Sequence, residues 1–200
     1  YFALIDIHQY EKQISDELDK LKTNISFNGA PNGLGINIST DKANLPAALA
    51  LLEDLLKNQK FDEAEFEKLK LENKAGIEAN KNDPQFVAGE KLSKLTTNYP
   101  KGHPLYASTA DEEVEDLANV TIADLKKFYT DFYGANNSIS AFVGELDKAL
   151  IKTFVQKTFG GWNSKSSFAR IAQKHFETKG KTVAFNTPDK TNAMLLGNIN

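Results

Sequence analysis

Hydrophobic residues recur at helical spacing through most of the first 160 residues of this 200-residue chain. Apolar residues three and four positions apart, with charged residues between them, form one apolar stripe along a helix. The clearest stripe lies between Ile122 and Phe132, and it predicts that Phe128 and Phe132 are buried. The pattern predicts seven helices, over residues 11–21, 45–57, 62–82 and 147–159, and from starts at Asp83, Thr109 and Thr121.

Short runs of alternating apolar and polar residues predict strands between these helices. The runs Thr23–Phe27 and Leu34–Ser39 flank a segment of asparagine, glycine and proline, which predicts a β-hairpin. Further strands are expected at Ile139–Val143, Thr182–Phe185 and Ala193–Ile199. We therefore predict an α+β fold, a two-layer sandwich in which helices cover one face of a mostly antiparallel sheet.

Composition narrows the classes of function. The net charge of −3 argues against a nucleic-acid-binding protein that uses a basic face. No apolar run approaches the ~20 residues of a membrane span, so no membrane-spanning segment is expected. Arg170 is the only arginine and cysteine is absent, which disfavours a guanidinium clamp and excludes a thiolate metal site.

Residues with metal or catalytic chemistry are sparse. The histidines His8, His103 and His175 are far apart, and no two share the i, i+4 spacing of a zinc-binding helix. His8 opens a stretch that resembles an inverted zinc motif, except that Lys12 takes the place of the second histidine. Because a cation opposes metal binding, we interpret His8 as a chance match, and His103 and His175 as solvated or turn-packing residues. The residues alone predict a folded domain without a visible active site.

Six stretches, in this order and at this spacing, resemble the pitrilysin/insulinase-type zinc metallopeptidases. They are Phe61–Phe66, Asp83-Pro84, Tyr99–Leu105, Val120–Tyr129 with Phe132-Tyr133, Val143–Asp147 and Phe159–Trp162. The resemblance covers about residues 11–162 and continues weakly at Thr187–Lys190.

This resemblance implies repeated α+β units that enclose a chamber for peptides. Catalysis in the family uses an inverted His-x-x-Glu-His helix in one repeat, whose two histidines and a later glutamate bind zinc while the motif glutamate activates water. Measured back from the helix that ends at Leu21, this motif would precede Tyr1. The resemblance thus implies zinc in the catalytic repeat of a parent protein, and we expect no cofactor in this segment.

Two departures from the family pattern indicate a non-catalytic, degenerate repeat. Thr23–Phe27 and a glycine-rich turn replace the Asn-Ala-x-Thr-like strand that flanks the zinc cleft of active repeats. Glu78 falls close to the position of the distal zinc ligand, but Leu71 occupies the position of a supporting glutamate. We therefore assign no catalytic, cofactor-binding or metal residue, and treat Glu78 as a positional match that is better explained as a helix-surface carboxylate.

We expect the chain to be a segment of a longer protein, with one repeat over residues 1–162, a linker over 163–180 and the start of the next repeat over 181–200. Three functions remain open: a non-catalytic repeat that forms chamber wall and substrate contacts, a scaffold or binding subunit with the same fold, and a catalytic repeat cut just after its motif. The implied partners are other repeats of the same chain or a homologous subunit, and a peptide substrate. An envelope location is common among bacterial members of the family.

Overall fold

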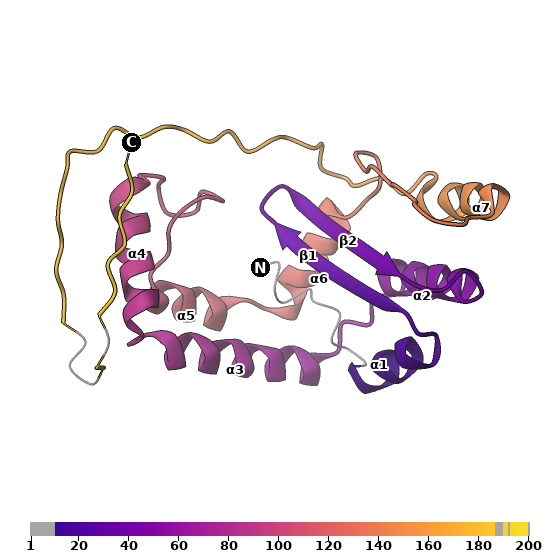
Figure 1. Cartoon of the computed structure of the whole chain (residues 1–200), viewed down its shortest axis with the longest axis horizontal. Helices are drawn as coiled ribbons and strands as arrows, with labels where there is room; N and C mark the ends of the chain where they lie inside the picture. The colour runs from indigo at the N-terminus through magenta and orange to yellow at the C-terminus, as the bar shows by residue number, and fades with distance from the viewer. Residues whose placement is uncertain (1–10, 187–189, 192, 200) are drawn as a thin grey trace. The chain divides into compact units, whose positions relative to one another are not determined.

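The computed structural model describes residues 11–186, 190–191 and 193–199. For residues 11–13 it describes the backbone alone. These residues contain helices and one short antiparallel sheet, so the predicted α+β class is confirmed (Figure 1). The elements are α1 (Glu11–Lys20), β1 (Asn24–Ala30), β2 (Gly33–Ser39), α2 (Leu45–Lys57), α3 (Glu63–Asn80), α4 (Pro84–Thr96), α5 (Ala110–Asn119), α6 (Ile122–Phe132) and α7 (Lys148–Phe159).

The chain folds into two compact units. Among the described residues, unit 1 comprises 11–66 and 121–170, and unit 2 comprises 67–120 and 171–199. The chain therefore leaves unit 1 within α3 and returns to it at the start of α6. The predicted division into a repeat, a linker from 163 and a second repeat from 181 stays a prediction.

The predicted hairpin is confirmed in unit 1. Strands β1 and β2 pair in antiparallel register, with Ile25 opposite Ile38 and Phe27 opposite Ile36. Because alternate residues of a strand point to the same face, these four apolar side chains share one face of the ribbon. That face packs against the helical core of the unit.

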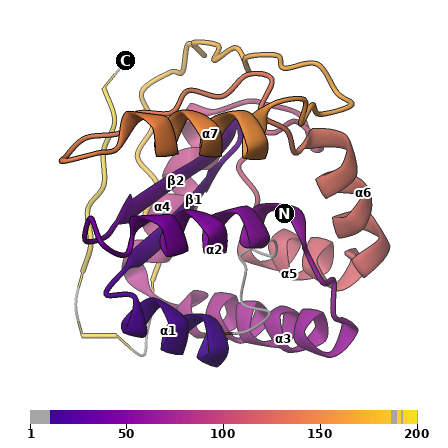
Figure 2. The same ribbon diagram turned by 90° about the vertical axis from the view of Figure 1, so that its right-hand side faces the viewer.

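The core of unit 1 lies between the hairpin, α2 and α7. Helices α2 and α7 contact each other and lie side by side (Figure 2). Leucines at helical spacing along α2 explain why this helix buries one face. The buried cluster consists of Leu45, Leu49, Leu52, Leu56 and Phe154.

Helix α6 contacts α2 through Tyr129, whose hydroxyl donates to the Leu56 carbonyl. Its start carries the predicted capping box, in which the Thr121 side chain accepts from the Asp124 N–H and the Asp124 carboxylate accepts from the Thr121 N–H. Leu125 is buried, whereas Phe128 is half-buried. Phe132 is 57% exposed, so its predicted burial is wrong. It is the last residue of α6, where it packs beside Phe128 at 4.9 Å between ring centroids and leaves its outer side to solvent.

In unit 2, local capping signals again define the helices. The Asp83 side chain accepts hydrogen bonds from the N–H groups of Gln85 and Phe86 and so begins α4 as predicted. The α5 start carries a complete capping box between Thr109 and Glu112. These bonds satisfy donors that a helix N-terminus otherwise leaves unpaired.

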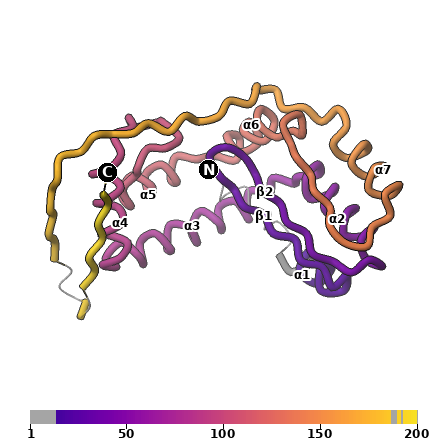
Figure 3. Tube along the Cα trace, turned by 45° about the horizontal axis from the view of Figure 1, so that its top comes forward, coloured from indigo at the N-terminus to yellow at the C-terminus, as the bar shows by residue number. Residues whose placement is uncertain are grey.

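Three expected strands do not form within the described residues. Ile139–Val143 is extended but unpaired, with Ile139 98% and Val143 96% exposed, while Phe142 packs on the core of unit 1. Residues 182–186 and 193–199, whose course Figure 3 traces, also lack strand pairing within the described part of the chain. An alternating sequence indicates which face would be buried, but a strand needs a neighbour at its edge for its backbone hydrogen bonds. The described sheet therefore has two strands, β1 and β2.

No helix in the described part of the chain has both the length and the apolar character needed to cross a membrane.

Candidate functional site

The residues with predicted metal chemistry do not come together in the described part of the chain. His8 lies outside the described residues, as does the side chain of Lys12. His175 is exposed in the segment that follows α7, and His103 lies in the loop between α4 and α5. The described residues contain no group of three or more histidine, aspartate or glutamate side chains that could hold a metal ion.

Glu78 lies near the end of α3, where its side chain is 56% exposed. Its carboxylate lies 3.8 Å from the Nζ of Lys74, one helical turn earlier. Glu78 therefore has a lysine neighbour. No set of zinc ligands is present among the described residues. The assignment of no catalytic, cofactor or metal residue to this chain stays a prediction.

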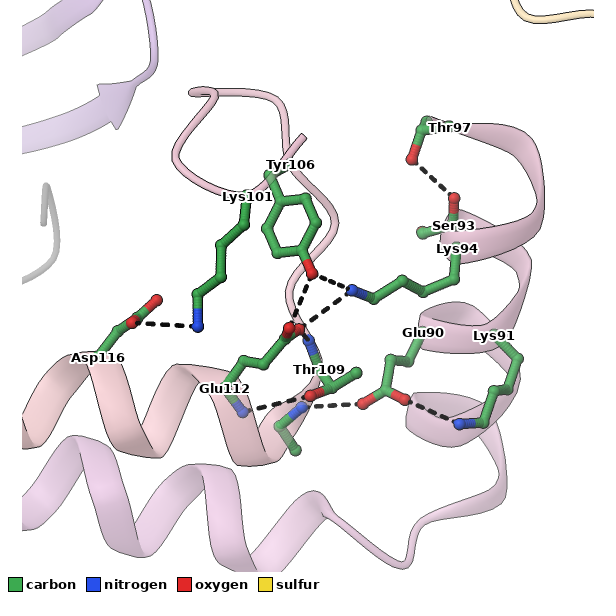
Figure 4. A network of polar contacts seen from close by, with 11 residues as sticks. Glu90, Lys91, Ser93, Lys94, Thr97, Lys101, Tyr106, Thr109, Glu112 and Asp116 are labelled. Atoms are coloured by element: carbon green, nitrogen blue, oxygen red, sulfur yellow. Dashed lines mark hydrogen bonds and ion pairs between the residues drawn. The ribbon is translucent and has the colours of Figure 1, made fainter. Parts of the chain in front are cut away.

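A network of hydrogen bonds and ion pairs connects α4 with α5 in unit 2 (Figure 4). Glu112 is its centre: one carboxylate oxygen accepts from the Tyr106 hydroxyl at 2.7 Å, and the other accepts from the Thr109 N–H at 2.8 Å. Lys94 of α4 donates to this second oxygen at 3.0 Å and to the Tyr106 hydroxyl at 2.7 Å. The Lys94 ammonium also lies 4.1 Å from the centre of the Tyr106 ring.

These contacts fix the protonation states of the network. The Thr109 N–H, the Tyr106 hydroxyl and Lys94 together lower the pKa of Glu112 to about 2, because each stabilises the carboxylate. The Tyr106 hydroxyl and Glu112 raise the pKa of Lys94, which keeps the ammonium charged. Glu112 is therefore an anion and Lys94 a cation at every physiological pH.

Further carboxylates of α4 and α5 lie near this network. The Glu90 carboxylate of α4 accepts from the Ala110 N–H at 2.9 Å and forms an ion pair with Lys91 at 3.3 Å. Desolvation, with the negative charges of Glu90 and Asp116, raises the pKa of Glu113. Lys101 of the preceding loop approaches Asp116 at 4.0 Å.

The arrangement is suited to holding α4, the loop and α5 together. A general acid or base works best with a pKa near the working pH, and a lysine nucleophile needs a lowered pKa. In this network the carboxylate pKa moves down and the lysine pKa moves up, away from both requirements. The network therefore holds three segments of unit 2 together. Neither Glu112 nor Lys94 has a pKa suited to acid–base or nucleophilic chemistry.

The sequence indicated only part of this network. The Thr109–Glu112 spacing predicted the capping box, but nothing in the pattern pointed to Lys94 or Tyr106. Their contribution depends on a loop of thirteen residues, 97–109, that brings Tyr106 back to α4.

His103 is a turn-packing residue, one of the two alternatives predicted for it. Its ring stacks on Tyr99 with centroids 4.3 Å apart and planes 10° apart. Its Nδ1 accepts a hydrogen bond from the Leu105 N–H at 3.0 Å. Gly102, at φ +89°, provides the left-handed conformation that this tight turn requires.

The described residues form an α+β protein in which polar contacts hold α4, the following loop and α5 together. Residues 119–198 match the family model Peptidase_M16_C, which is described as the Peptidase M16 inactive domain. This match confirms the predicted resemblance to a non-catalytic repeat of the pitrilysin/insulinase-type peptidases. Comparison with curated proteins returns no significant match.

The matched region spans less than half of the chain and begins at the last residue of α5. It includes α6, α7 and most of the extended segment that follows. The Lys94–Tyr106–Glu112 network lies before it in sequence. Residues 119–198 therefore resemble the inactive M16 domain, whereas the network belongs to the part of the chain that precedes the match.

Proposed function

We propose that this chain is a non-catalytic repeat of a zinc-dependent endopeptidase, in which it forms part of the chamber wall and contacts the peptide substrate. The match of residues 119–198 to the inactive M16 domain carries this proposal. In the proposed assembly, zinc and the activated water belong to a catalytic repeat of the same chain or of a homologous subunit. The complete repeat is proposed to be a two-layer sandwich whose sheet extends beyond β1 and β2.

The unpaired segment Ile139–Val143 supports a role in substrate contact. Its Phe142 side chain packs on the core of unit 1, while Ile139 and Val143, on the opposite side, are almost fully exposed. Extended segments with free backbone groups and alternating apolar side chains can bind an extended peptide by strand addition. Such a surface suits the unfolded peptides that a chamber would admit.

The test uses the protein that contains both the catalytic repeat and this chain. A double variant, Ile139→Ser with Val143→Ser, should raise the KM for an unstructured peptide several-fold and leave kcat nearly unchanged, because these side chains would contribute binding and no chemistry. Leu71→Ser is the matched control, since Leu71 is 67% exposed on α3. An unchanged KM in the double variant would contradict the substrate contact.

The 200-residue chain by itself should not hydrolyse peptides, because hydrolysis requires an activated water and the described residues contain no ligand set that would activate one through a metal. Chelator-sensitive cleavage by the isolated chain would show that it is a catalytic repeat. Absence of cleavage even in the presence of its natural partner repeats would favour the scaffold function.

A further inference from the structure

The segment that follows α7 returns to unit 2 in an extended conformation. Within residues 171–180, only Ile171 and Phe176 are half-buried, and the other side chains are exposed. The attachment of this segment therefore concentrates at a few positions along an otherwise solvated stretch.

Tyr99 provides the best-defined point of attachment. Its hydroxyl oxygen accepts a hydrogen bond from the Lys174 N–H at 2.7 Å. Its ring meets the Phe176 ring edge to face, with centroids 4.8 Å apart and planes 86° apart. One tyrosine thus contacts the backbone at residue 174 through its hydroxyl and the side chain at residue 176 through its ring.

Tyr99 is held in place by the loop to which it belongs. Tyr99 is only 9% exposed, and the His103 ring stacks on its ring. The His103 N–H donates to the Pro100 carbonyl at 3.0 Å, and the Tyr106 N–H donates to the His103 carbonyl at 2.9 Å. These bonds, with the one from the Leu105 N–H to His103 Nδ1, hold the loop in a turn without any contribution from the extended segment.

We propose that residues 99–106 form a docking site for an extended peptide segment, and that residues 171–178 of this chain are its tethered ligand. The site recognises a free backbone N–H followed two residues later by an aromatic side chain. A neutral hydrogen bond and an aromatic pair are each weak interactions in water. We infer that the segment exchanges between a docked and a released state while the rest of unit 2 stays folded.

Amide hydrogen exchange of the full ¹⁵N-labelled chain tests this docking. Tyr99→Phe keeps the ring but removes the acceptor, so exchange at the Lys174 amide should become about five- to tenfold faster, the effect of one lost hydrogen bond. Exchange along α4 should not change. Tyr129→Phe is the matched control, because the Tyr129 hydroxyl also bonds to a backbone group, the Leu56 carbonyl, in unit 1.

A second pair of variants tests the aromatic contact. Phe176→Leu should accelerate exchange at Lys174 by a similar factor, whereas Phe185→Leu, at an exposed aromatic of the same segment, should leave it unchanged. Unaltered Lys174 exchange in both Tyr99→Phe and Phe176→Leu would overturn the proposal. Equal acceleration along α4 would also overturn it, since the tyrosine would then support the fold of unit 2 and not a separate docking event.

Competition in trans tests whether the site accepts a peptide. An unlabelled synthetic peptide of residues 171–178, added in excess, should displace the tethered segment and speed up exchange at Lys174 in the labelled wild-type chain. The same peptide with Phe176→Ala should have no effect. If the unmodified peptide leaves the exchange rate unchanged, residues 99–106 are not a docking site for free extended segments.

Discussion

Lys94 and Glu112, eighteen positions apart, lie 3.0 Å from each other through Nζ and Oε2 and join α4 to α5. The same carboxylate oxygen accepts the Thr109 N–H, so a helix cap and an interhelical ion pair share one acceptor. Loss of the Glu112 charge would weaken the α5 cap and the α4–α5 contact at once.

The stability of unit 2 should depend on acid through Glu112. Its pKa in the folded chain, about 2, lies below the ordinary value of 4.5, so the carboxylate stabilises the fold above pH 4.5. That contribution should decline as the pH falls from 4.5 towards 2. In urea denaturation, Glu112→Gln should be less stable than wild type at pH 7 and should lose less stability between pH 5 and pH 2.

The exposed Glu115 on the same helix provides the control for this experiment. Glu115→Gln should leave both the stability at pH 7 and the acid profile close to those of the wild type. If Glu112→Gln has the same acid profile as the wild type, the network does not control the acid sensitivity of unit 2.

Thr158 of α7 should be a site of stabilisation. Its side chain is fully buried, and its hydroxyl oxygen has no hydrogen-bond partner among the described residues. Because an unsatisfied buried polar group costs about 1–3 kcal/mol, Thr158→Val, which keeps the shape, should raise the free energy of unfolding by about 1 kcal/mol. Thr130→Val is the control, since the Thr130 hydroxyl donates to the Lys126 carbonyl at an exposed site. A destabilised Thr158→Val variant would contradict the interpretation.

Lys70 should stabilise the end of α5. Its ammonium, on a side chain that is 16% exposed, donates to the carbonyls of Ala118 at 3.3 Å and Val120 at 3.0 Å. A cation is favourable at the negative end of a helix, so Lys70→Met should lower the free energy of unfolding by about 1–3 kcal/mol. Lys126→Met, at an exposed position of α6, should change it by less than about 0.5 kcal/mol.

The two apolar environments of unit 1 should respond differently to truncation. Leu52 is 4% exposed in the α2–α7 core, so Leu52→Ala should cost about 2–5 kcal/mol. Phe132→Ala should cost less than about 1 kcal/mol, because more than half of that side chain already contacts water. Denaturation midpoints of both variants provide the measurement, and equal losses would place Phe132 in the core after all.

Zinc titration by calorimetry should show no stoichiometric binding below micromolar concentration. Catalytic zinc usually needs three protein ligands, and the described residues give Glu78 a lysine neighbour instead. Tight binding of one equivalent that disappears in Glu78→Ala would identify a metal-binding repeat.

Local interactions made several features of this protein predictable from its sequence. The caps at Asp83, Thr109 and Thr121 involve residues two or three positions apart, so their spacing alone indicates where α4, α5 and α6 begin. The β1–β2 hairpin is equally local, because its turn residues and its alternation select one register. The resemblance to the pitrilysin/insulinase family was also visible in the sequence, and its stretches between Val120 and Trp162 lie within residues 119–198, which match the Peptidase M16 inactive domain.

Contacts between distant residues required the tertiary structure. The bonds from Lys94 to Tyr106 and from Lys174 to Tyr99 depend on how loops return to helices, and residue spacing does not record that path. Burial is non-local in the same way: Phe132 lies on the apolar stripe of α6, yet its side chain is 57% exposed. Ile139–Val143 has the alternation of a strand but pairs with no strand in the described part of the chain. Sequence determines which bonds a residue can form, whereas the fold decides which partner lies within reach.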